Sequence, residues 1–324
     1  MTWRVPPSTL PLPLLGRAAA LACCGLLLGC LAWTPVARAQ AWVPGKGQGS
    51  IALVFQQSQT NKGTDSRGNA VNLGKVIGST LSLSLDYGLS ERWAISANLP
   101  LKRNRYIGND PHYLPANFPI ANDQRFIDDG QYHAGWADWS VALRYQWRTE
   151  PFLVTPFIAY ARPSHDYTFF GHSGFGTQQW AVQAGVHIGN WFAPPRQNLY
   201  WQAGYAYTYE QPVSHRRVNH DVLSLELGYF PTPRLNTHLS IEHSKSYGDG
   251  IHSLDEFSNA DGSPNFENIL YHDQLFLARY TKVTVGMDFQ LNARLQLSVR
   301  YGRTLKAALA HEYEDVSIGL SRSF

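Results

Sequence analysis

The chain has 324 residues, of which 16% are charged and 13% aromatic, and its mean hydropathy is −0.27. The charged fraction lies well below the roughly 25% of an average soluble domain, which argues against a disordered polyelectrolyte. Beyond residue 39, no run approaches the roughly 20 apolar residues of a transmembrane helix. Such a chain, rich in aromatics yet not hydrophobic on average, is expected where apolar and polar residues alternate.

The first 39 residues have the three parts of a secretory signal peptide. Arg4 and Arg17 supply positive charge, an apolar segment spans 18–33, and the small-residue motif Ala-Arg-Ala follows at 37–39. We predict cleavage after this motif, so that residues 1–39 are a signal peptide and residues 40–324 form one mature domain. Two alternatives are a membrane-anchor helix, for which the apolar stretch is short, and a lipoprotein site, because 27–30 reads LLGC.

Removal of this segment changes the charge and leaves no cysteine. Residues 1–39 hold three of the 27 basic residues and none of the 24 acidic ones, so the mature chain has 24 of each and no net charge. A basic footprint for nucleic acid is therefore missing from the mature sequence. All three cysteines, Cys23, Cys24 and Cys30, also lie in this segment. The mature chain thus has no thiolate for nucleophilic or metal chemistry.

An alternation with a period of two runs along the mature sequence. It is clearest at 81–87, which reads LSLSLDY, and it indicates a strand with one apolar and one polar face. The pattern predicts twelve strands of about 9–11 residues, the length that crosses a bilayer at a tilt. The other eleven are expected near 51–57, 93–101, 139–147, 154–162, 180–188, 201–209, 223–229, 239–242, 283–289, 295–301 and 315–324.

The connections between these strands alternate in length. Short, turn-rich connections are predicted at 88–92, 148–151, 189–198, 231–234 and 291–294. Long ones are predicted at 59–78, 102–136, 163–178, 210–219, 244–272 and 303–312. Strict alternation that starts with a long connection is typical of an outer-membrane barrel with short periplasmic turns. It predicts that both termini lie in the periplasm.

The polar faces of the strands carry charged groups, which favours a barrel with its apolar side outward. In hydrocarbon every backbone polar group needs a partner within the protein, and only a closed barrel gives a sheet without edges. Aromatic residues flank the short turns, as in an interfacial girdle: Tyr87, Trp93, Tyr145, Trp147, Trp191, Phe192, Tyr229 and Phe289. The predicted fold is therefore all-β: a closed antiparallel transmembrane β-barrel of about 12 strands. Its predicted lumen-lining residues are Asp86, Asn98, Asp138, Arg144, His187, Glu226, His238, Glu242, Asp288 and Arg300.

The end of the chain resembles the assembly signal of bacterial outer-membrane barrels. Residues 316–324 alternate and close on Phe324, although Arg322 interrupts the apolar face. The resemblance implies that the barrel-assembly machinery is a partner through this strand. The stretches 86–93 (DYGLSERW), 135–138 (GWAD) and the closing hairpin 285–324 are also similar to a family of outer-membrane transporters associated with meta-cleavage phenol degradation. That resemblance implies passage of small, aromatic or hydrophobic solutes, and no catalytic residue.

Motifs for enzymatic chemistry are largely missing. The sequence has no P-loop, no dinucleotide-binding glycine motif, no HExxH and no EF-hand loop, so we predict no cofactor. His238, Ser240 and Glu242 share the polar face of one strand and contain the groups of a hydrolytic triad. Known outer-membrane lipid hydrolases act from the lipid side, however, whereas this trio is predicted to face the lumen. We therefore assign no catalytic residue.

Nine of the twelve histidines fall in the predicted long connections or, like His220, directly after one: His112, His133, His165, His172, His215, His220, His252, His272 and His311. Together with Asp110, Asp128, Asp129, Asp249 and Asp255 they contain groups that bind divalent metals. Since no pair has a diagnostic spacing, we expect solvated loop residues and no metal site.

The width of a twelve-stranded barrel lies between filled eight-stranded barrels and open porins. We consider that the connection 102–136, with Tyr113, Phe118, Phe126 and Trp136, either folds inward as an aromatic constriction or remains a disordered surface loop. The sequence thus predicts an outer-membrane channel or facilitator for small solutes. The alternatives are a structural or receptor barrel that uses its long loops and an outer-membrane lipid hydrolase.

Overall fold

The computed structural model describes residues 40–71, 74–108, 127–149, 151–196 and 198–324. The predicted signal peptide and Tyr113, Phe118 and Phe126 of the predicted inward loop lie outside these residues. The strands are β1 (Gly49–Thr64), β2 (Ala70–Val71), β3 (Lys75–Gly88), β4 (Trp93–Ile107), β5 (His133–Trp136), β6 (Trp139–Tyr145), β7 (Trp147–Thr149), β8 (Phe152–Arg162), β9 (Ala181–Trp191), β10 (Leu199–Glu210), β11 (Val218–Thr232), β12 (Leu235–Gly248), β13 (Arg279–Gln290), β14 (Leu295–Ala308) and β15 (His311–Ser323). Two helical segments, η1 (Leu254–Phe257) and α2 (Phe266–Leu275), lie between β12 and β13.

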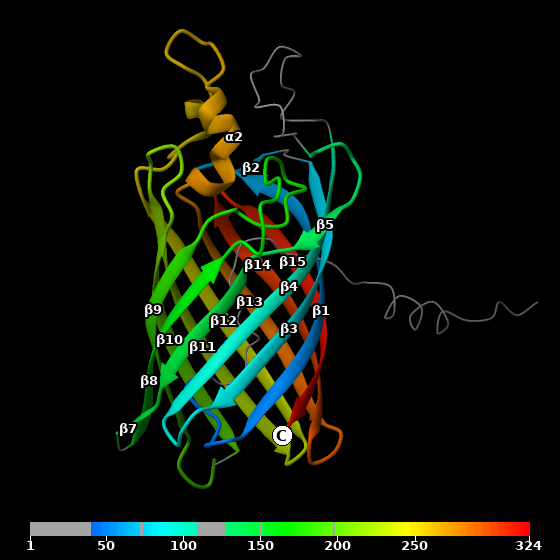
Figure 1. Cartoon of the computed structure of the whole chain (residues 1–324), viewed down its shortest axis with the longest axis vertical. Helices are drawn as coiled ribbons and strands as arrows, with labels where there is room; N and C mark the ends of the chain where they lie inside the picture. The colour runs from blue at the N-terminus through cyan, green and yellow to red at the C-terminus, as the bar shows by residue number, and fades with distance from the viewer. Residues whose placement is uncertain (1–39, 72–73, 109–126, 150, 197) are drawn as a thin grey trace, which may run out of the picture.

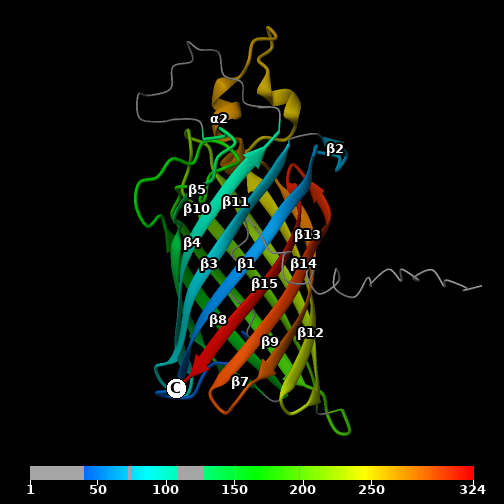
Figure 2. The same ribbon diagram turned by 90° about the vertical axis from the view of Figure 1, so that its right-hand side faces the viewer.

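The strands form one closed antiparallel sheet in chain order (Figures 1 and 2). The wall of the barrel has twelve strand positions. Strand β2 lies outside this count as a short appendage, and β5, β6 and β7 follow one another at a single position. The first and last strands close the circle, from Ser50 opposite Ser323 to Gly63 opposite His311. The predicted twelve-stranded barrel is thus confirmed.

The outer surface of the barrel is apolar. Along β3, Leu81, Leu83 and Leu85 point outward and are 37%, 48% and 37% exposed, and Leu225 on β11 is 53% exposed. In water such a belt would aggregate, whereas in lipid it is solvated, and the closed ladder leaves no strand edge in hydrocarbon. The fold is therefore a transmembrane β-barrel with the predicted apolar-out orientation. No helix in the described part of the chain is long and apolar enough to span a membrane.

Several strands are longer than the predicted 9–11 residues, and β1 reaches 16. The excess lies at the long-connection end. The predicted long connection 303–312 is wrong, because Ala308 and His311 are joined by a two-residue turn in which Leu309 has a φ of 48°. Strand β14 continues to Ala308. Within this extension Thr304 is buried in the interior and Leu305 is exposed outside, so the alternation of faces holds beyond the predicted strand 295–301.

The connection between β12 and β13 forms a cap on the long-connection end (Figure 1). Helix α2 begins at an N-cap, where the Asn265 side chain accepts a hydrogen bond from the backbone N–H of Asn268. Leu275 of the helix packs with Ile251 and Val218 in a small buried cluster. This cluster attaches the helix to the rim of the barrel.

Candidate functional site

The inner wall of the barrel surrounds a cavity of about 460 Å³. Five of the ten predicted lumen residues line it: Asp86, Asn98, Asp138, Arg144 and Glu242. Two more, Asp288 and Arg300, line a smaller pocket against β14 and β15. The last three, His187, Glu226 and His238, contact residues of the inner wall: Phe157, Tyr200 and Arg300, respectively.

The segment that precedes β1 enters the lumen at the short-turn end. The carbonyl of Ala41, which is fully buried, accepts hydrogen bonds from Gln146 Nε2 at 2.9 Å and Thr155 Oγ1 at 2.7 Å. Its N–H donates to Oε1 of Gln202 at 3.2 Å. Gln146 lies between β6 and β7, Thr155 is in β8 and Gln202 is in β10, so these hydrogen bonds hold Ala41 against one side of the inner wall. We call residues 40–48 the plug segment.

Arg144 joins the plug segment to the barrel wall. Its guanidinium donates to the Asp86 carboxylate and, at 3.5 and 3.4 Å, to the carbonyls of Gln40 and Trp42. The Arg144 side chain is only 7% exposed, and that of Asp86 20%. A buried guanidinium needs a counter-charge and hydrogen-bond acceptors. Asp86 on β3 supplies the counter-charge, and the plug segment supplies two carbonyl acceptors.

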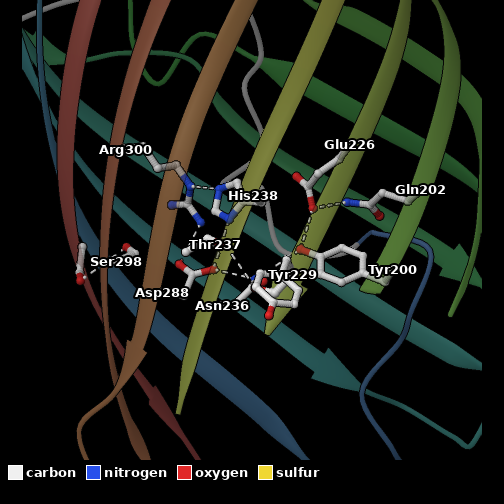
Figure 3. Close-up of polar contacts among 11 residues, drawn as sticks. Tyr200, Gln202, Glu226, Tyr229, Asn236, Thr237, His238, Asp288, Ser298 and Arg300 are labelled. Atoms are coloured by element: carbon white, nitrogen blue, oxygen red, sulfur yellow. Dashed lines mark hydrogen bonds and ion pairs between the residues drawn. The ribbon is translucent and has the colours of Figure 1, made fainter. Parts of the chain in front are cut away.

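A second polar network lies on β10 to β14, on the inner face (Figure 3). Glu226 accepts hydrogen bonds from Tyr200 at 2.9 Å and from Gln202 at 3.1 Å. Farther along, Arg300 bonds to Asp288 at 3.2 Å and to Nε2 of His238 at 3.4 Å. Through Gln202 this network contacts the plug segment as well.

Glycines opposite the large rings make room for this network. Gly228 pairs with Tyr200, and a Cβ at Gly228 would lie 1.9 Å from the Tyr200 ring. Gly286 pairs with His238, and a Cβ there would lie 2.2 Å from Nε2. On the inner wall, a large side chain on one strand therefore lies opposite a glycine on the neighbouring strand, as in other narrow barrels.

Aromatic rings complete the floor at the short-turn end. Trp42 of the plug segment packs edge-on against Trp191 at 6.2 Å and Tyr200 at 5.9 Å between ring centroids. Trp191 has the same parity along β9 as His187, so it belongs to the inner side of the rim rather than to the predicted outer girdle. The exposed rings of Trp93, Trp147, Tyr229 and Phe289 agree with that girdle.

The candidate triad is not assembled. His238 contacts Arg300 and Asp288, whereas Glu242, about 13 Å away along the same strand, accepts a hydrogen bond from Tyr280 at 2.9 Å. The two groups belong to separate networks of the wall, which gives no arrangement for nucleophilic catalysis.

The opposite end of the cavity is more apolar and lies under the long connections. Phe169, Phe276 and Leu309 line it there, beside His172 and Asp273. Trp136, from the predicted inward loop, is 47% exposed and does not line the cavity.

The predicted loop histidines have different surroundings. His133 lies 2.9 Å from Asp129, and this hydrogen bond lowers the pKa of the exposed Asp129 carboxyl. His172 and His272 are buried, so the expectation of solvated side chains is wrong for both. His112 lies outside the described residues.

The plug segment and Asp273 could not be predicted from the sequence, because neither has a local sequence pattern.

Comparisons with known proteins give a fold but no family. No family model and no curated protein matches the sequence. An outer-membrane channel from Pseudomonas putida F1 has a TM-score of 0.64 at 14% identity, over 89% of this chain and 100% of that chain. The NanC porin has a TM-score of 0.48 at 9% identity, over 84% and 98%. The β domain of the Bordetella autotransporter BrkA has 0.48 at 14%, over 86% and 100%. The first likeness establishes a shared barrel fold, and the phenol-degradation family is not confirmed.

Proposed function

We propose that this protein is an outer-membrane channel for small solutes, narrowed near its short turns by the plug segment. The observation that carries the proposal is the cavity of about 460 Å³, which Gln40 and Arg144 line at one end and His172 and His311 at the other. The plug is held by hydrogen bonds and one aromatic contact set rather than by a strand ladder. It can therefore be displaced without opening the barrel.

The proposed location in the outer membrane, and the side on which the short turns lie, are based on the sequence. Export requires the leader at 1–39, and its cleavage would leave Gln40 as the first residue, inside the lumen. The apolar belt suits the outer membrane, and the short turns and both termini would face the periplasm. Assembly would proceed through the C-terminal strand and the barrel-assembly machinery.

The wall of the cavity favours small solutes that combine an apolar part with a polar group. Phe157, Phe169 and Phe276 line it among serine, threonine and carboxylate side chains. Pockets of several hundred Å³ with apolar walls and a few polar groups are typical small-molecule sites. Small aromatic solutes, which the family resemblance implies, fit this chemistry.

Deletion of residues 40–44 tests the proposal. We expect the shortened protein to show several-fold higher conductance in planar bilayers than the mature chain, because the carbonyls and Trp42 that fill the floor are removed. A control with 40–44 replaced by glycine and serine keeps the length and removes the contacts. If neither variant conducts and liposomes take up no solute, the channel function is wrong.

A receptor barrel is the second candidate, since it too would have a narrowed lumen. The two functions differ in the parent protein. A channel passes small aromatic solutes into liposomes with its loops intact, whereas a receptor passes none and binds a ligand that deletion of a long connection abolishes.

A further inference from the structure

We propose that His172, His272 and Asp273, with His311 beside them, form a binding site for one zinc-class transition-metal ion at the long-connection end. His172 lies between β8 and β9, His272 and Asp273 lie in α2, and His311 begins β15. One donor atom from each of the first three residues lies within 4.8 Å of the other two. Two segments distant in sequence thus present imidazole and carboxylate groups at one point, and His311 comes from a third.

The spacing is close to that of a coordination shell. Nε2 of His272 lies 3.4 Å from Oδ1 of Asp273, and Nδ1 of His172 lies 4.0 Å from Oδ2. Neighbouring donors in a tetrahedral zinc site are separated by about 3.3 Å, given metal–ligand bonds of roughly 2.0–2.1 Å. Side-chain shifts of about 1 Å therefore suffice to close the site.

His311 is placed to supply a fourth ligand. Its ring centroid is 5.0 Å from that of His172, and the two rings are nearly perpendicular at 87°. The His272 ring is also nearly perpendicular to that of His172, at 89° and 5.3 Å between centroids. Since His311 is paired to β1 in the barrel wall, it offers a rigid position against which the loop ligands can close.

The orientation of His272 suits a metal ligand. Its Nδ1 lies 2.7 Å from the carbonyl oxygen of Ile269. A carbonyl oxygen only accepts, so Nδ1 carries the proton and, in the neutral ring, Nε2 presents its lone pair toward Asp273. A hydrogen bond from the other ring nitrogen to a backbone carbonyl is the usual support of a metal-binding histidine.

The backbone at His172 is held by the carboxylate of Asp128, which lies in the connection between β4 and β5. The N–H groups of His172 and Ser173 donate to the two oxygens of Asp128, at 3.0 and 2.8 Å. The preceding Gly171 has a φ of +104°, a conformation that L-residues rarely adopt. The turn therefore directs the side chain, which is 3% exposed, toward α2.

The donor set selects the metal. Two or three imidazoles with one carboxylate suit Zn²⁺, Co²⁺, Ni²⁺ and Cu²⁺, whereas Ca²⁺ and Mg²⁺ prefer oxygen ligands. His172, Asp273 and His311 line the cavity, so an ion can enter through the mouth of the barrel. A bound ion would cross-link α2, the β8–β9 connection and β15 above the lumen.

The test is a titration of the purified full chain, without a polyhistidine tag, with Zn²⁺ and with Co²⁺. We expect one ion per chain by calorimetry, a tetrahedral Co²⁺ absorption spectrum, and no binding of Mg²⁺ or Ca²⁺. His272→Phe keeps the ring packing against Phe257 and Phe276, and Asp273→Asn keeps the shape of the side chain. Each should weaken Zn²⁺ binding at least about tenfold.

The matched control is His252→Phe, which changes an exposed histidine of the same connection and should leave the affinity unchanged. Should His272→Phe fail to fold, Asp273→Asn carries the test, because that side chain is 28% exposed. No saturable binding by the parent chain, or equal affinity of the parent and Asp273→Asn, would overturn the proposal. Solute uptake is a separate readout, so a failure here leaves the channel proposal standing.

Discussion

The guanidinium of Arg144 has three partners inside the barrel: the carboxylate of Asp86 and the carbonyls of Gln40 and Trp42. Removing one member of a buried ion pair is costly, because the other charge stays desolvated. The residue thus links the stability of the wall to the position of the plug segment.

Arg144→Gln should lower the free energy of unfolding by about 3 kcal/mol, the usual cost of leaving a buried charge unpaired. It should also raise the conductance, because the plug loses two of its contacts. Denaturant titration in detergent measures the first effect and planar bilayers the second.

The double variant Asp86→Asn/Arg144→Gln is the matched control for that prediction. It leaves no unpaired charge, so it should regain part of the lost stability while its conductance stays raised. A double variant that is as unstable as Arg144→Gln would show that the ion pair is not the cause.

Parity along a strand predicts the face of a residue, but not its partner. His238 and Glu242 share the inner face of β12, as their spacing requires, yet they bond to Arg300 and Tyr280 on other strands. The register between strands decides such contacts, and hydrophobic alternation alone fixes that register only to within two residues.

At the scale of the elements, the closing pair β1–β15 determines whether the barrel exists. Phe324 exchanges two backbone hydrogen bonds with Gly49, both 3.0 Å long, and its ring stacks on Tyr87 at 6.3 Å. A Cβ at Gly49 would lie 2.8 Å from the Phe324 ring. The glycine therefore makes room for the terminal ring at the seam.

Phe324→Ala should lower the amount of folded protein in the outer membrane several-fold. It removes one aromatic contact of about 1 kcal/mol and the proposed assembly signal. The heat-modifiable band on gels of membrane fractions measures the folded amount. Phe289→Ala removes a ring that is 44% exposed, against 53% for Phe324, and that lies away from the seam. A similar loss in that variant would contradict a special role for Phe324.

The lengths of the connections are only partly predictable from the sequence. Short turns such as 88–92 and 291–294 agree closely with the structure, since β3 ends at Gly88 and β14 begins at Leu295. Long connections such as 59–78 and 102–136 are shorter in the structure than predicted, because β1 and β4 continue with mostly polar residues on both faces. In these extensions the alternation of apolar and polar residues is lost, whereas the backbone hydrogen bonds between neighbouring strands continue.

In the molecule as a whole, apolar side chains cover the outside of the barrel and polar side chains fill its interior, the reverse of the distribution in a soluble protein. Leu225 is the middle residue of β11 and is 53% exposed, which places it in the belt at mid-height. Its environment in the membrane would be hydrocarbon, where a charge is poorly solvated.

Leu225→Arg should destabilise the barrel by roughly 2–4 kcal/mol in lipid vesicles, the cost of an arginine near the bilayer midplane. The comparison is Leu225→Ala, which shortens the side chain without adding charge. Reversible unfolding from vesicles measures both. Equal stability of the two variants would place this surface outside the hydrocarbon.

The closed twelve-stranded barrel and its outward apolar face could be predicted from the sequence. These features follow from a period of two, which each strand carries locally. Only the folded chain shows that residues 40–42 lie inside the lumen near the short turns and that His172, His272 and Asp273 meet near the long connections. Those contacts join segments far apart in the chain, and only the closure and register of the barrel bring such segments together.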